Sequence, residues 1–187
     1  MAGAGAVKDI QQQLLAAGLE NLGQVEHLSH WPRLMQESPL MQDFTPAEAD
    51  ILGSVMLRVK AQPGQVLIGE DDSSDWMMLL LSGTVEVVKR KIGAEIDATE
   101  PGSTNRLAVL KEGASLGEMS MLDGEPRYAS CIALSEVEVA VLGRNGVARL
   151  ITAQPAIGAK LLVKITQLLA QRLRNTSNQV IRLLKEQ

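Results

Sequence analysis

Short apolar runs, broken at close intervals by turn residues, dominate the middle of the chain and limit the folds that it can adopt. Each run is rich in Val, Leu, Ile or Met, and Gly, Asp, Ser or Pro residues separate it from the next. Such runs are typical of short strands joined by turns. They are residues 66–68, 76–81, 84–89, 107–110, 129–134 and 137–142. The pattern predicts an antiparallel jelly roll or small barrel.

Helical patterns precede these runs. Residues 8–23 carry apolar residues three and four apart and end in glycine, which predicts an amphipathic helix. A second helical segment is predicted over 25–35. A third is predicted over 45–59, because its opening Thr-Pro-Ala-Glu supplies an N-cap, a proline at the first helical position and a capping box. The polar stretch 97–105 is expected to be a mobile hairpin loop.

A short helix ending at Ala153 and a long helix beginning at Pro155 are predicted after the last strand. The long helix would measure roughly 45 Å at 1.5 Å per residue, which is more than a domain of this size can cover. Leucine or threonine recurs at intervals of seven in its sequence, with two further apolar residues beside that row. These positions are Leu162, Leu169, Thr176 and Leu183, flanked by Leu173 and Val180. We therefore expect a homodimer seam, with packing against the chain's own barrel as the alternative.

These elements predict an α+β fold that is mainly β. A chain of 187 residues is long enough to bury the core of one such domain with further segments attached. We expect an N-terminal helical extension over 1–40, an antiparallel β-barrel domain over 41–154 and a long C-terminal helix over 155–187.

The composition argues against several functions. A formal charge of −4 does not suit a protein that coats nucleic acid, and a single Phe and a single Tyr do not suit one that stacks single-stranded bases. The lone Cys131, inside an apolar run, is expected to be a buried side chain in a reducing compartment. Because we find neither a signal peptide nor an apolar run that could span a bilayer, we expect a cytoplasmic protein without membrane contact.

Residues 116–133 contain the pattern of a site for a small anion. Gly117 and Glu118 open a predicted helical turn, residues 123–126 form a predicted tight turn, and Arg127 follows directly. A glycine lets backbone N–H groups approach a phosphate, a helix N-terminus is positive, and a guanidinium binds two oxygens at once. Each feature alone is common on protein surfaces, but together they predict a phosphate site.

This order of residues resembles the phosphate-binding cassette of cyclic nucleotide-binding domains, as found in regulators of the catabolite-activator (CRP/FNR) type. Residues 63–68, 69–72 and 75–87 resemble the opening strands of that domain. Residues 172–180 are similar to the dimer helix of the activators, in which a Thr-Ser pair reaches the base. The resemblance covers roughly 41–180.

The resemblance implies that Glu118 accepts the ribose 2′-hydroxyl, that Arg127 pairs with the cyclic phosphate, and that backbone N–H groups near Gly117 and Tyr128 complete the cradle. Without ligand, burial of Glu118 and Arg127 would be costly unless they pair with each other or with Arg172. The implied ligand-binding residues are Gly117, Glu118, Met119, Ser120, Arg127, Tyr128, Ala129, Arg172, Thr176 and Ser177.

Two features depart from the family pattern. Tyr128 occupies a position where the family has a small residue, so its phenol could bind the phosphate, stack on a base or fill the pocket. The expected ligand is cAMP or cGMP, and the alternatives are a cyclic dinucleotide such as cyclic di-GMP, or a ligand-free dimeric interaction scaffold. The helix-turn-helix that follows the dimer helix in transcription factors of the family is also missing, so direct DNA binding is not expected.

The sequence indicates a receptor in signal transduction rather than an enzyme. Small barrels include metal-dependent oxygenases, but both histidines, His27 and His30, precede the predicted strands, and no catalytic pair or nucleophile motif is visible. We expect no metal and no cofactor besides the cyclic nucleotide. The downstream protein partner is not specified by any sequence feature.

Overall fold

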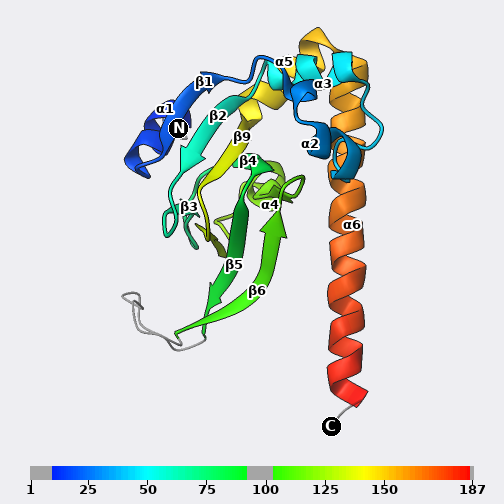
Figure 1. The fold of residues 1–187 in the computed structure, drawn as a ribbon. Coiled ribbons are helices and arrows are strands. Elements are labelled where there is room, and N and C mark those ends of the chain that lie inside the picture. Colours follow the sequence, from blue (N-terminus) through cyan, green and yellow to red (C-terminus); the bar gives the residue numbers. More distant parts are fainter. Residues whose placement is uncertain (1–9, 92–102, 186–187) are drawn as a thin grey trace, which may run out of the picture.

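Two antiparallel sheets form the body of the protein in the computed structural model, which describes residues 10–91 and 103–185 (Figure 1). The first sheet has the strand order β1-β2-β9-β4-β7, and the second has the order β3-β8-β5-β6. The strands are β1 (Glu20–Gln24), β2 (Leu57–Ala61), β3 (Val66–Ile68), β4 (Trp76–Ser82), β5 (Thr84–Arg90), β6 (Thr104–Lys111), β7 (Ser115–Leu116), β8 (Ser130–Ala133) and β9 (Val137–Gly143). The expected antiparallel jelly roll and its six predicted strands are confirmed.

Six α-helices and one 3-10 turn accompany the sheets in the described residues. They are α1 (Ile10–Ala16), the 3-10 turn η1 (Leu28–His30), α2 (Pro32–Glu37), α3 (Pro46–Gly53), α4 (Glu118–Asp123), α5 (Arg144–Ala153) and α6 (Pro155–Lys185). The α+β class and the long C-terminal helix are therefore confirmed.

The strand β4 is buried on both faces, and this explains its unbroken apolar sequence. Trp76 and Met78 belong to an inner core that also contains residues of β3, β5, β8 and β9. Met77 and Leu79 belong to an outer core, in which the sheet packs against α3, α5 and α6. A strand that must satisfy two apolar surroundings loses the usual alternation of polar and apolar residues.

The predicted start of α3 is confirmed in detail. Thr45 Oγ1 accepts a hydrogen bond from the Glu48 backbone N–H at 3.3 Å, and Glu48 Oε2 accepts one from the Thr45 N–H at 2.8 Å. Glu48 also receives the Lys160 ammonium at 2.6 Å. This ion pair, with the capping bonds, holds the pKa of the Glu48 carboxyl below its usual range and ties α3 to the first half of α6.

The helix α6 runs along the whole side of the molecule (Figure 1). Its first half packs on the outer core through buried Ile157, Leu161 and Ile165. From Gln171 to Lys185 every residue is exposed in the single chain.

The N-terminal segment differs from the helix that we expected over 8–23. The helix α1 ends at Ala16, Gly18 takes a positive φ of 72°, and residues 20–24 form β1, which pairs with β2. Leu14 and Leu19 both enter the inner core. The apolar spacing predicts one helix, but the structure divides this segment into a helix, a turn and an edge strand.

Two further predicted boundaries are wrong. The helix expected over 45–59 ends at Gly53, because residues 57–61 pair with β9 as β2. The helical segment expected over 25–35 begins only at Leu28, is interrupted at Trp31 and continues as α2 to Glu37. Thr104 and Asn105 belong to β6, and the rest of the predicted hairpin loop 97–105, apart from Ser103, lies outside the described residues.

Candidate ligand-binding site

The short helix α4 carries Glu118 into the interior. Gly117 precedes it and Gly124 follows it, with φ values of 79° and 78°, and this left-handed conformation favours glycine. Arg144 at the start of α5 donates from Nε to the Met121 carbonyl at 2.6 Å. Because six residues are too few for a helix to be stable alone, these contacts fix α4 against the barrel.

The side chain of Arg127 is 2% exposed and is held by three hydrogen bonds. Nε donates to Ser74 Oγ at 2.9 Å, Nη1 to the Gly117 carbonyl at 2.7 Å and Nη2 to the Trp76 carbonyl at 2.6 Å. Burial lowers the pKa of the Arg127 guanidinium, and nearby carboxylates, including that of Asp72, oppose this shift. A guanidinium has five N–H donors, so these bonds leave two for a ligand.

The backbone around Arg127 is also fixed. Its N–H donates to the Asp72 carbonyl at 2.8 Å, and its carbonyl accepts the Asp71 N–H at 2.9 Å. The turn between β3 and β4 therefore sets the position of the arginine.

The carboxylate of Glu118 is paired across the molecule with α6. Arg172 Nη1 donates to Glu118 Oε2 at 3.0 Å, and Arg172 Nη2 donates to the Ser115 carbonyl at 2.6 Å. Ser115 Oγ donates to Glu118 Oε1. Of the two pairings that we expected for a buried Glu118 without ligand, the structure has the one with Arg172, whereas Arg127 is bound by Ser74 and backbone carbonyls.

A cavity of about 380 Å³ brings these groups together between the β-roll, α4 and α6. The charged residues that line it are Arg127, Arg172 and Glu118. Every residue of the ligand set predicted from sequence lines this cavity except Ser177, which is exposed on α6. With two cations and one carboxylate, the cavity carries the charge that a single phosphodiester anion would neutralise.

Other cavity residues were missed by the sequence interpretation. They are Ile68, Val87, Leu107, Ala108, Leu110, Ser115, Leu116, Cys131, Asn175 and Gln179. Asn175, Thr176 and Gln179 follow Arg172 by three, four and seven residues and so lie on the same face of α6. Helical periodicity counted from Arg172 could have added the two amides and placed Ser177 off this face.

The thiol of Cys131 lies in the wall of the cavity and is buried, as expected. Burial raises its pKa to about 12, which outweighs the opposing effect of Arg127. At neutral pH the thiol is therefore protonated and acts as a small apolar group.

The two histidines lie away from this cavity. Their rings are 4.7 Å apart, and His27 Nδ1 is 3.5 Å from Asp50 Oδ2. No group of three or more His, Cys, Asp or Glu that could hold a metal ion occurs within residues 10–91 and 103–185.

Gly117 offers a test of how closely the cavity is built. A Cβ at this position would lie 2.7 Å from Arg127 Nη1, whereas a Cβ at Gly124 would meet only the end of Arg144, at 3.0 Å. Alanine at either position should destabilise the fold by about 1 to 2 kcal/mol, because both have positive φ. Because only the Cβ at position 117 would displace Arg127, we expect Gly117→Ala to weaken the binding of a phosphate ligand by about tenfold in Kd and Gly124→Ala to leave it unchanged. Calorimetry measures both affinities. Equal affinities of the two variants would show that Arg127 does not hold the ligand.

Comparison with known proteins identifies the class. Residues 58–154 match the family described as the cyclic nucleotide-binding domain, and the chain belongs to that family. The fold agrees with this: a cyclic nucleotide-binding domain from Methylobacillus flagellatus has a TM-score of 0.73 at 30% identity, with 87% of this chain and 88% of that chain covered. The catabolite activator protein of Thermus thermophilus has a TM-score of 0.67 at 29% identity, with 78% of this chain and 63% of that chain covered.

Proteins that are similar in sequence include two whose names refer to cAMP. A cAMP-dependent protein kinase regulatory subunit of Aspergillus niger is 33% identical over 117 residues, which cover 63% of this chain and 26% of that protein. The cyclic AMP receptor protein of Thermus thermophilus is 31% identical over 140 residues, which cover 75% of this chain and 59% of that protein. The matched part of the chain thus spans about a quarter of the length of the kinase regulatory subunit and less than two thirds of the length of the bacterial receptor. No helix in the described ranges has the length and apolar character needed to cross a bilayer.

Proposed function

We propose that this chain is a regulatory receptor for a cyclic purine mononucleotide and catalyses no reaction itself. The observation that carries the proposal is the convergence of Arg127, Glu118 and Arg172 on one cavity of about 380 Å³. The volume lies within the range of small-molecule sites. Among cyclic mononucleotides, cAMP is favoured over cGMP by the relatives whose names refer to cAMP.

The chemistry of the lining residues suggests where the phosphate, the ribose and the base of the ligand would bind. The two remaining N–H groups of Arg127 bind the singly charged cyclic phosphate, as a charge-assisted pair. Glu118 accepts the ribose 2′-hydroxyl, since each carboxylate oxygen has a second lone pair beside those that bind Ser115 and Arg172. The base then lies toward α6, where Thr176 lines the cavity and Ser177 is free to reach a base held by a partner chain.

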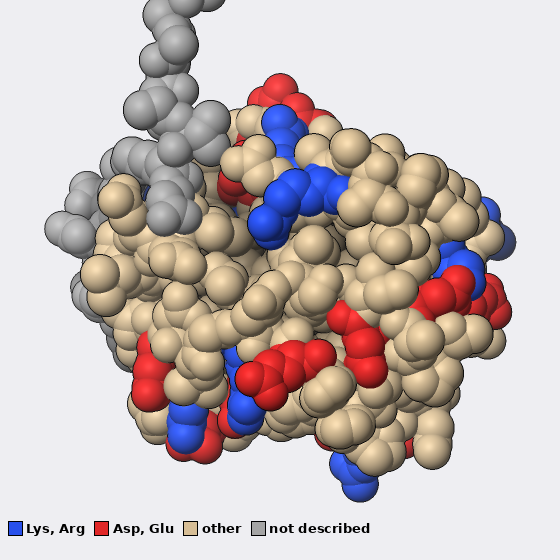
Figure 2. Space-filling view, turned by 90° about the horizontal axis from the view of Figure 1, so that it is seen from above, with Lys and Arg blue, Asp and Glu red and all other residues tan. Residues whose placement is uncertain are grey.

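We further propose that the receptor is a homodimer that acts on another protein in the cytoplasm rather than on DNA. The formal charge of −4 argues against DNA as the target. Figure 2 looks down on the end of the molecule where α3 and α5 lie, and there Lys and Arg occur in small groups among Asp and Glu instead of one basic patch. Nucleic-acid interfaces usually need a continuous basic surface.

Calorimetric titration tests the proposal. Saturable heat is expected with cAMP or cGMP and not with 5′-AMP, which has the same base and sugar but an open, doubly charged phosphate. Saturation by cyclic di-GMP alone would assign the site to a dinucleotide. Absence of saturable heat with all of these ligands at millimolar concentration would favour a ligand-free interaction scaffold, in which the Glu118–Arg172 pair is permanent.

A further inference from the structure

The aromatic ring of Tyr128 lies at the mouth of the cavity instead of inside it. Its side chain is 62% exposed although it lines the cavity, and Leu107 and Met119, on the same lining, are each 51% exposed. By contrast, Arg127 and Glu118 are buried, at 2% and 1% exposed. The cavity therefore has a charged floor and an apolar mouth.

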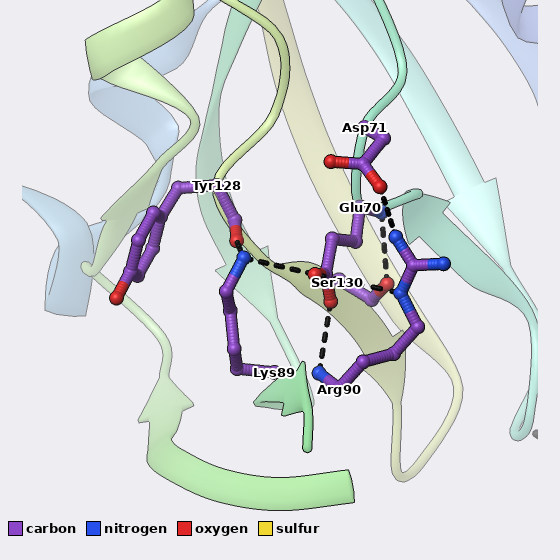
Figure 3. Close-up of polar contacts among 6 residues, drawn as sticks. All are labelled: Glu70, Asp71, Lys89, Arg90, Tyr128 and Ser130. Atoms are coloured by element: carbon purple, nitrogen blue, oxygen red, sulfur yellow. Dashed lines mark hydrogen bonds and ion pairs between the residues drawn. The ribbon is translucent and has the colours of Figure 1, made fainter. Parts of the chain in front are cut away.

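Lys89 fixes the ring and the backbone of Tyr128 (Figure 3). Its ammonium lies 4.4 Å from the centroid of the Tyr128 ring and donates to the Tyr128 carbonyl at 2.6 Å. A cation over an aromatic face is attracted by the electron density of the ring. One face of Tyr128 is thus occupied by Lys89, while the described residues include no aromatic or cationic partner for its other face.

Lys89 is in turn held by Glu70 in the turn after β3. Glu70 Oε1 accepts from Lys89 Nζ at 2.8 Å, and Glu70 Oε2 accepts from the Arg90 backbone N–H at 2.9 Å (Figure 3). The Glu70 N–H donates to Ser130 Oγ at 2.9 Å. Burial raises the pKa of the Glu70 carboxyl, but the bonds from Lys89 and Arg90 outweigh it, so the pKa lies below the usual range and the carboxylate stays charged.

We propose that Tyr128 is a stacking wall for the base of the bound cyclic nucleotide, and that Lys89 and Glu70 are the positioning residues that hold the ring in place. The inference rests on the proposed function. A nucleotide has a charged phosphate and sugar at one end and a flat apolar base at the other, which matches the floor and the mouth of this cavity. An exposed ring held from one side by a partly buried ion pair offers its other face at little entropic cost.

Stacking predicts a loss that depends on the base. Removing an aromatic wall costs about 1 to 3 kcal/mol per stacked base, so Tyr128→Ser should weaken cAMP binding about 5- to 150-fold in Kd. Tyr128→Phe keeps the ring and should bind like the wild type. Neither change should alter the affinity for ribose 3′,5′-cyclic phosphate, which has no base. Folding should be unaffected, because the side chain is largely exposed.

A fluorescent base reports on the role of Lys89. The cyclic monophosphate of 2-aminopurine riboside should be quenched on the wild type and on Tyr128→Phe, and much less on Tyr128→Ser. Lys89→Met should reduce the quenching and weaken cAMP binding about threefold, whereas Lys91→Met removes the same charge from an exposed position two residues away and should change neither.

The outcomes separate the inference from the proposed function. The stacking proposal is wrong if the wild type binds cAMP and Tyr128→Ser binds it equally well or better, with full quenching of the 2-aminopurine fluorescence. The ring would then merely replace a small residue. If the losses are the same for cAMP and for ribose 3′,5′-cyclic phosphate, Tyr128 acts on the phosphate instead. If the wild type binds no cyclic nucleotide, the proposed function fails and the inference fails with it.

Discussion

Arg127→Ala is expected to weaken cAMP binding by about 1.5 to 3 kcal/mol, which is about 10- to 150-fold in Kd. The guanidinium is the only buried cation on the cavity floor among the described residues, and its fork suits the paired oxygens of a cyclic phosphate. Arg127→Lys keeps the charge but loses the fork, so it should recover only part of this loss. Calorimetric titration measures both variants.

Stability must be measured beside affinity, because Arg127 also holds the barrel together. Its three bonds satisfy Ser74 and the carbonyls of Gly117 and Trp76, and their loss should lower the free energy of unfolding by about 3 kcal/mol. Arg144→Ala is the matched control, since Arg144 donates to the Met121 carbonyl of α4 but does not line the cavity. The control should lose stability and keep its affinity; normal cAMP binding by a folded Arg127→Ala would place the phosphate elsewhere.

Six of the strands could be predicted from sequence because each of these six carries its signal locally. Segments such as 76–81 and 137–142 are short, apolar and bounded by turn residues, whichever strand they pair with. The strands β1 and β2 have no such signal. Leu15, Leu19 and Leu22 are four and three residues apart, as in a helix, and only pairing with β2, more than 30 residues away, makes 20–24 a strand. Pairing over such distances is tertiary and overrides local propensity.

In the candidate site, too, the part with a local sequence pattern could be predicted and the part that depends on long-range contacts could not. Gly117, Glu118 and Arg127 form one contiguous pattern, so the phosphate cradle could be predicted together with its order of residues. The clamp of Ser115 and Arg172 on Glu118 joins parts of the chain more than 50 residues apart, and sequence suggested Arg172 only as one of two partners. Lys89 and Glu70, which hold Tyr128, carry no local signal, because in the sequence an ion pair between a strand and a distant turn looks like two unrelated surface charges.

The second half of α6 should pair with its counterpart in a dimer. All of its residues from 171 to 185 are exposed in the single chain, and isolated helices of this length are marginal in water. Leu173 and Val180 repeat at intervals of seven, as do Thr176 and Leu183, which gives the a and d positions of a coiled coil. Thr176 also lines the ligand cavity, so the expected seam and the candidate site share this residue.

A charge introduced on the expected seam should separate the chains. Val180 and Ile181 are both 50% exposed, but only Val180 belongs to the expected seam. Val180→Glu would place two carboxylates opposite each other across the axis and should weaken dimerisation more than 100-fold, because buried like charges repel without a partner. Ile181→Glu carries the same change on the outer face and should remain dimeric. Light scattering at micromolar concentration distinguishes the two.

Ligand and assembly are expected to be coupled through Arg172 and Thr176. A ligand shifts an equilibrium only by contacting its two states differently, and cAMP would contact both the barrel and this helix face. Addition of cAMP should therefore slow amide hydrogen exchange over residues 172–180 in the wild type, while exchange in the first half of α6, which packs on the outer core, changes little. If the wild type is a monomer under these conditions, the predicted dimer seam is wrong. If saturating cAMP leaves exchange over 172–180 unchanged, the predicted coupling is wrong even if the protein is a dimer.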